Sequence, residues 1–114
     1  MSFRQDYIER AIRKLAEMVA RALGLARSGE AEAGLTLLED AIASTFGMPL
    51  PMLLKLTPET VWSLFGPERA RMLAEALTTH HAILELQGRG AHGEASKELA
   101  LALTRRADAQ STMR

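Results

Sequence analysis

Apolar residues recur at helical spacing from the start of this chain. Ile8, Ile12 and Leu15 follow one another at intervals of four and three residues, with charged residues on the positions between them. This spacing places the apolar side chains on one face of an α-helix. The pattern predicts a long helix from Ser2 to about Arg27, and Gly29 is suited to the turn that ends it.

The same spacing returns after that turn. Leu35, Leu38 and Ile42 share one face of a second predicted helix. This helix runs from Glu30 to about Phe46.

Residues 47–66 carry the densest apolar run of the chain and its only Trp. Prolines near the start of this segment hold the residues before them in extended geometry. We predict a short helical turn from Pro51 through Leu56. A short helix up to Phe65 should follow, with Thr57 as its N-cap.

Helical periodicity resumes once the Gly66-Pro67 pair has interrupted it. A long helix is predicted from Pro67 to about Gln87, and the glycine-rich residues 88–93 read as a turn. A last helix is expected from Glu94 to about Asp108. The chain as a whole therefore predicts an all-α fold of about five helices.

Composition supports this fold class. The 114 residues include 19 Ala and 18 Leu but only two Val and four Ile, and unbranched residues of this kind favour helix over strand. The length fits one domain with one core. We expect this domain to span residues 1–110, and residues 111–114 to form a disordered tail, because they carry little apolar surface.

Charge and hydropathy exclude several classes of partner. Fourteen basic residues balance fourteen acidic ones, so no net field attracts nucleic acid or an anionic membrane. The longest apolar run is far shorter than the ~18 residues that suggest a membrane span. The N-terminus lacks the uninterrupted apolar region of a secretory signal. We therefore expect a cytoplasmic protein with no nucleic-acid or membrane partner.

Two segments of the chain can be overlaid with an offset of 61 residues. The shared positions are Gly29 and Gly90, Gly34 and Ala95, Leu38 and Leu99, Ala41 and Ala102, and Ile42 and Leu103. The pattern resembles the turn and second helix of a tetratricopeptide repeat, in which small residues let helices approach closely. The resemblance implies two repeat-like units, about 3–46 and 67–108, with residues 47–66 inserted between them.

The whole chain also resembles a family of short, uncharacterised bacterial proteins with a tetratricopeptide-like fold. The matching stretches are Phe3, Asp6-Tyr7-Ile8, Arg10, Ile12, LTLLEDAI, LLKLTPE and LAEAL…ILELQG. Gly34, where a repeat usually has Ala, and the His80-His81 pair depart from the pattern. Since this family has no assigned function, the resemblance implies a fold and no activity.

In a repeat of this type, one stripe of the first helix of each unit lines a concave groove. The resemblance places Val19 and Leu23 on this stripe in the first unit, and Leu77, His80 and Leu84 in the second. An aliphatic groove together with the apolar insertion exceeds what a monomer normally exposes. Something is therefore expected to cover both.

The favoured interpretation is that the insertion folds back onto this groove. Its plugs would be Leu50, Leu53, Leu54, Trp62 and Phe65. Exchange of the segment between two copies, or a site for a transient partner, are the alternatives. The partner-binding or groove candidates are therefore Val19, Leu23, Leu50, Leu53, Trp62, Leu77, His80 and Leu84.

One short motif, THHAILE, superficially suggests a metal site. His81 and Glu85 can face the same way on a helix, but His80 points about 100° away. This leaves two ligands where zinc needs three or four, although His92 in the following turn could add a third. We favour a solvated His81–Glu85 pair with His80 half-buried in the groove, and expect no metal and no cofactor.

No other motif has the form of a catalytic site. The Arg69/Arg71 and Arg105/Arg106 clusters lack interleaved aromatic residues, and we interpret them as helix-end charges rather than a phosphate track. We expect a non-catalytic protein–protein interaction or scaffold module that acts through the apolar groove and the insertion, with a homodimer as one form. The alternatives are a small metal-dependent enzyme using His80, His81 and Glu85, and an obligate homo-oligomeric structural protein.

Overall fold

The computed structural model describes residues 3–112, and within that range all regular structure is helical. The long helices are α1 (Phe3–Arg27), α2 (Ala31–Phe46), α4 (Pro58–Leu86) and α5 (Glu94–Thr112), and the short ones are α3 (Leu50–Leu53) and the 3-10 helix η1 (Gly90–Gly93). The all-α prediction is confirmed. Ser2, the predicted first residue of the first helix, lies outside the described residues.

Helix α5 is longer than the sequence predicted. It continues past Asp108 to Thr112, so Ser111 and Thr112 belong to the helix although they were assigned to a disordered tail. The other two residues of that predicted tail lie outside the described range. Within residues 3–112, no helix combines the length and the apolar character that crossing a bilayer requires.

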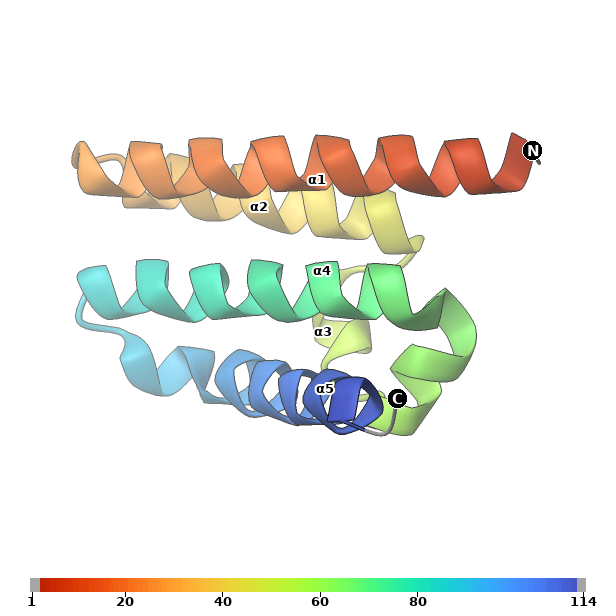
Figure 1. Ribbon diagram of the computed structural model, residues 1–114. Helices are drawn as coiled ribbons and strands as arrows, with labels where there is room; N and C mark the ends of the chain where they lie inside the picture. The colour runs from red at the N-terminus through yellow and green to blue at the C-terminus, as the bar shows by residue number, and fades with distance from the viewer. Residues whose placement is uncertain (1–2, 113–114) are drawn as a thin grey trace.

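The long helices form two antiparallel hairpins, α1–α2 and α4–α5, that lie one against the other (Figure 1). Helix α4 lies at the centre of this arrangement and contacts α1, α2 and α5. The short α3 lies in the connection between the hairpins. The two hairpins therefore share one continuous core, with α4 in contact with every other long helix.

The core is built from the apolar stripes that the sequence predicted. Helix α1 buries Leu15, Val19, Ala22 and Ala26, at intervals of four, three and four residues. The most completely enclosed side chains elsewhere include Leu38 and Ile42 in α2, Leu73, Leu77 and Ile83 in α4, and Leu103 in α5. Apolar burial on this scale is the main force that holds the hairpins together.

A sharp kink divides α4 into two helical pieces, as the sequence predicted. Gly66 has φ 82° and ψ 169°, which is not a helical conformation and is one that a residue with a Cβ rarely adopts. The first piece begins at the predicted cap, because the backbone N–H of Thr60 donates to the Thr57 side-chain oxygen at 3.1 Å. The kink turns residues 58–65 back toward α5 (Figure 1).

The insertion packs within its own chain. Leu50, Leu53 and Trp62 are buried, and Leu54 and Phe65 are partly buried against the same core. The ring of Phe65 meets the ring of Phe46, at the end of α2, edge to face with centroids 5.0 Å apart. The insertion thus joins the end of the first hairpin to the start of the second.

Candidate functional site

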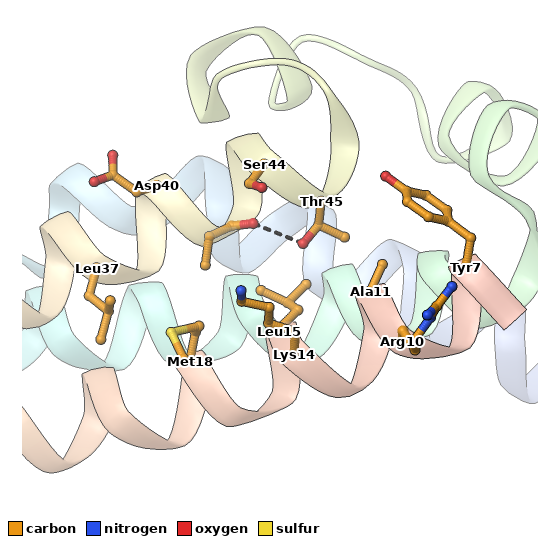
Figure 2. Close-up of a pocket in the computed structure, with 11 residues that line it drawn as sticks. Tyr7, Arg10, Ala11, Lys14, Leu15, Met18, Leu37, Asp40, Ser44 and Thr45 are labelled. Atoms are coloured by element: carbon orange, nitrogen blue, oxygen red, sulfur yellow. Dashed lines mark hydrogen bonds between the residues drawn. The ribbon is translucent and has the colours of Figure 1, made fainter.

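An open groove runs between α1 and α2 on the outer side of the first hairpin. Its volume is about 520 Å³. Figure 2 shows the side chains that border it, drawn from both helices. They are Tyr7, Arg10, Ala11, Lys14, Leu15 and Met18 from α1, and Leu37, Asp40, Ala41, Ser44 and Thr45 from α2.

The lining of this groove is apolar in its middle and polar at its edges. Leu15, Met18 and Leu37 contribute aliphatic or thioether surface. The hydroxyl of Thr45 donates to the Ala41 carbonyl oxygen at 2.8 Å, so it needs no further partner (Figure 2). A surface of this kind gains most from apolar side chains of a partner, because removing its carbon atoms from water is favourable.

Charged residues border the groove on both helices. Arg10 and Lys14 stand on α1, and Asp40 stands on α2; all three are exposed. The ring of Tyr7, 62 % exposed, lies at one end of the groove (Figure 2). An aromatic ring and charges of both signs around an apolar centre are typical of protein interfaces.

The structure places the predicted groove residues elsewhere. Val19, Leu50, Leu53, Trp62, Leu77, His80 and Leu84 are buried, and Leu23 is partly buried against the core. The stripe predicted to line a concave groove therefore forms part of the contact between the hairpins. None of these residues lines the groove between α1 and α2.

Sequence reasoning missed the open groove, although a signal for it was present. Ala11, Met18 and Leu37 lie beside the buried stripes and make the apolar face of each helix wider than a single contact requires. Their spacing indicates a second apolar stripe on the first hairpin. The sequence did not indicate which of the two stripes would meet the second hairpin.

A polar network centred on the buried His80 joins three of the long helices, with Glu39 at its exposed end. His80 in α4 is 5 % exposed, which is more buried than predicted because the first hairpin covers it. Its Nε2 lies 3.1 Å from Glu39 Oε2 in α2, and its Nδ1 lies 2.9 Å from Ser96 Oγ in α5. Since an ionised carboxylate only accepts, Nε2–H donates to Glu39, and in the neutral imidazole Nδ1 accepts from the Ser96 hydroxyl.

The order Ser96, His80, Glu39 has the connectivity of a hydrolase triad, but its surroundings differ. Ser96 is 1 % exposed, so its hydroxyl has no open path to a substrate in this structure. A nucleophile must lie beside a site that holds the reacting atom, together with donors for the developing oxyanion. Burial of Ser96 therefore favours a structural role, in which the hydrogen bonds satisfy polar groups inside the core.

The neighbouring imidazole makes a separate set of contacts. His81 Nδ1 lies 3.2 Å from the Gly93 carbonyl oxygen, and its Nε2 lies 3.1 Å from Glu85 Oε1. The predicted pairing of His81 with Glu85 is therefore present. Both ring nitrogens of His81 therefore face oxygen atoms that accept hydrogen bonds. The contact of His81 with the Gly93 carbonyl joins the turn before α5 to the side of α4.

These contacts bear on the metal-site hypothesis. His80 and His81 bind different partners, and His92 is exposed in η1. Within residues 3–112, no three His, Asp or Glu side chains lie close enough together to hold a metal ion. The motif THHAILE serves two distinct hydrogen-bond networks in this structure.

The sequence suggested that the arginine clusters are helix-end charges. In the structure, three of these arginines also contact aromatic rings. The guanidinium groups of Arg71 in α4 and Arg106 in α5 lie over the Trp62 ring, 5.9 and 5.3 Å from its centroid. Arg69 lies 5.5 Å from the centroid of Phe65 and donates from Nε to the Phe65 carbonyl oxygen at 2.9 Å. These arginines hold the insertion against the second hairpin through cation–π contacts.

Comparison of the chain with protein-family models, with curated proteins and with solved structures finds no match. The resemblance to the bacterial tetratricopeptide-like family therefore rests on the sequence motifs alone. The fold defines a small all-α protein of two packed helical hairpins with an open apolar groove on the first of them.

Proposed function

We propose that this protein is a non-catalytic, tetratricopeptide-like interaction module that binds a protein surface in the groove between α1 and α2. The observation that carries the proposal is the groove itself, an apolar channel between two helices with exposed charges along its edges. Its length and its lining suit an α-helix of a partner, which would lie along the two helices as a third helix.

The repeat-like character of the two hairpins supports this proposal. With the offset of 61 residues, many positions are buried in both hairpins: Val19 with His80, Ala22 with Ile83, Leu38 with Leu99, and Ile42 with Leu103. The correspondence fails at Gly34 and Ala95, because only Gly34 is buried. Tetratricopeptide-like proteins bind through surfaces formed by such stacked hairpins.

Trp62 supports the choice of this groove in particular. Arg71 and Arg106, which hold the Trp62 ring, correspond at the same offset to Arg10 and Thr45. Arg10 and Thr45 both line the open groove. The second hairpin therefore holds a large apolar side chain at the position where the first hairpin is open, which supports an apolar side chain of a partner as the group bound there.

The proposal can be tested by site-specific photo-crosslinking in an extract of the producing cells. A photoreactive phenylalanine analogue is placed at Ser44 in the groove, and in a control chain at the exposed Lys97 of α5. We expect a discrete crosslinked product from position 44 and none from position 97. The product should disappear when Met18→Asp puts a charge into the groove.

The absence of any product specific to position 44, or a product unaffected by Met18→Asp, would refute the proposal. Circular dichroism of Met18→Asp checks that this partly exposed position tolerates the charge. Loss of binding with retained helicity then reports on the groove rather than on folding.

A further inference from the structure

We infer that the occupant of the groove is a second copy of this chain, whose α1 lies over α2 of the first copy in a twofold symmetric dimer. The inference rests on the proposed function, since it names the partner for the same groove. It is carried by the charges at the edges of the groove and by the small residues in its lining.

The edges of the groove carry unpaired charges of opposite sign. Lys14 on α1 and Asp40 on α2 are both exposed, and within residues 3–112 neither makes an ion pair or a hydrogen bond through its side chain. A groove with a positive edge on one helix and a negative edge on the other is complementary to itself. Interfaces between identical subunits related by a twofold axis require this property.

The direction of the twofold axis follows from these charges. A twofold axis in the interface plane and perpendicular to the helices would place α1 over the partner's α1. Arg10 and Lys14 of both copies would then lie close together, and their like charges would repel. A twofold axis in the interface plane and parallel to the helices places α1 over the partner's α2. Each copy then presents Lys14 to the other's Asp40, and the contact occurs twice.

The register of the hairpin makes this contact feasible. Gly34 packs on the backbone of Ala22, and this fixes how α1 and α2 align. Counting from that contact, Asp40 lies opposite Ala16, about two residues or ~3 Å from Lys14 along the hairpin axis. The four-carbon lysine side chain spans that distance.

The middle of the groove also suits self-association. Ala11 and Ala41 leave space between the helices, and Met18 and Leu37 project beside that space. The Met18 side chain of one copy would enter the space beside Ala41 of the other, with a flexible thioether that adapts to it. Because the groove from Tyr7 to Met18 is only about 17 Å long, the interface is small and the dissociation constant should be micromolar.

Charge reversal on each side of the groove provides a sharp test. The oligomeric mass of the purified 12.5 kDa chain is measured by sedimentation equilibrium from low micromolar to near-millimolar concentration. Lys14→Asp alone and Asp40→Lys alone should each raise the dissociation constant at least about tenfold, because like charges then face each other twice. An equimolar mixture of the two variants should dimerise again, since the mixed dimer contains one native Lys14–Asp40 pair and one pair of reversed sign.

Lys97→Asp on α5 is the matched control and should leave the dimer unchanged. Lys14 and Asp40 are exposed, so neither reversal should alter the helical circular dichroism spectrum. A wild-type chain that stays monomeric throughout, a dimer insensitive to both reversals, or a mixture that fails to associate would each overturn the inference. A groove crosslink to a different protein would overturn it too, yet leave the proposed function standing.

Discussion

One buried imidazole bonds with side chains from two other long helices. His80 of α4 reaches Glu39 of α2 on one side and Ser96 of α5 on the other. Apolar contacts alone would allow the two hairpins to slide relative to each other, whereas hydrogen bonds of fixed geometry specify one alignment. The network therefore defines the position of α4 between its neighbours.

A double-mutant cycle tests this coupling. Ser96→Ala leaves Nδ1 of His80 without a partner, and His80→Leu leaves the Ser96 hydroxyl unpaired, so each should lower the free energy of unfolding by about 1–3 kcal/mol. The double variant should lose less than the sum of the two, with a coupling of about 1 kcal/mol. Urea unfolding, monitored by circular dichroism, gives the free energy of unfolding of the wild type, the two single variants and the double variant. Simple additivity would contradict the network.

Gly34 allows α1 and α2 to approach each other closely. A Cβ built at this position would lie 2.6 Å from the Ala22 carbonyl oxygen, a backbone atom that cannot move aside without separating the helices. Gly34 is also a position at which the family pattern has Ala. Its small size is therefore a requirement of this particular hairpin.

Alanine at two glycines should have opposite effects. Gly34→Ala should destabilise the chain by about 1–3 kcal/mol through overpacking. Gly24→Ala is the matched control in the adjoining helix, where a new Cβ meets nothing within 4 Å, and it should stabilise by about 0.5–1 kcal/mol. Thermal unfolding of both variants measures the difference. Equal melting temperatures would show that the hairpin can widen freely.

At the scale of elements, the position of the insertion depends on contacts with neighbouring helices. Residues 58–65 leave the axis of α4 at Gly66 and return over the second hairpin. Trp62 is held there between arginines from α4 and α5. The Nε of Arg106 is buried and has no hydrogen-bond partner among the described residues, and its guanidinium lies over the Trp62 ring.

Neighbouring arginines of α5 provide a matched test of this support. Arg106→Ala removes a cation–π contact and should destabilise the chain by about 0.5–2 kcal/mol. It should also increase quenching of the single Trp by acrylamide. Arg105 is exposed, and its replacement by Ala should change stability by less than about 0.5 kcal/mol. Similar quenching in both variants would argue against the contact between Arg106 and Trp62.

Most of the elements could be predicted from the sequence, because local chemistry specifies them. Apolar spacing indicated the four long helices, and Thr57 and the Gly66-Pro67 pair marked the start and the kink of α4. Periodicity shows which side chains share a face, but it does not show which face meets another helix. This is why Val19 and Leu77 were assigned to a groove that the insertion would cover, although they lie in the core between the long helices.

The contacts of charged side chains were harder to predict for a similar reason. Arg106 carries no local signal of stacking, since its partner Trp62 belongs to a distant part of the chain. The groove between α1 and α2 likewise depends on which side of the first hairpin the second hairpin covers. Such features follow from the packing of whole elements and not from short motifs.

At the scale of the whole molecule, stability should be unevenly distributed. Helix α4 touches all the other long helices, whereas the first turns of α1 extend beyond the end of α2 (Figure 1). Phe3 and Tyr7 in those turns are 93 % and 62 % exposed. Segments with few buried contacts open at low free-energy cost, and a central helix opens only with the entire fold.

Hydrogen exchange should resolve this difference. We expect the amides of residues 70–84 in α4 to exchange slowest, and those in the first turns of α1 and the last turns of α5 to exchange fastest. Mass spectrometry of peptic fragments measures the rates. Protection in the last turns of α5 equal to that in α4 would show that the two helices unfold together, with no central element.

The lining of the groove has a consequence for how such a protein could evolve. The position of Ala11 in the first hairpin corresponds to Met72 in the second, where the side chain is buried and 6 % exposed. A change of Ala11 to Met would therefore place a large side chain into the groove and fill it from within. Because the codons of Ala and Met differ at two or three nucleotides, a few nucleotide changes at this one position would fill the groove. Selection that keeps alanine at this position would thus be selection for the surface to remain open.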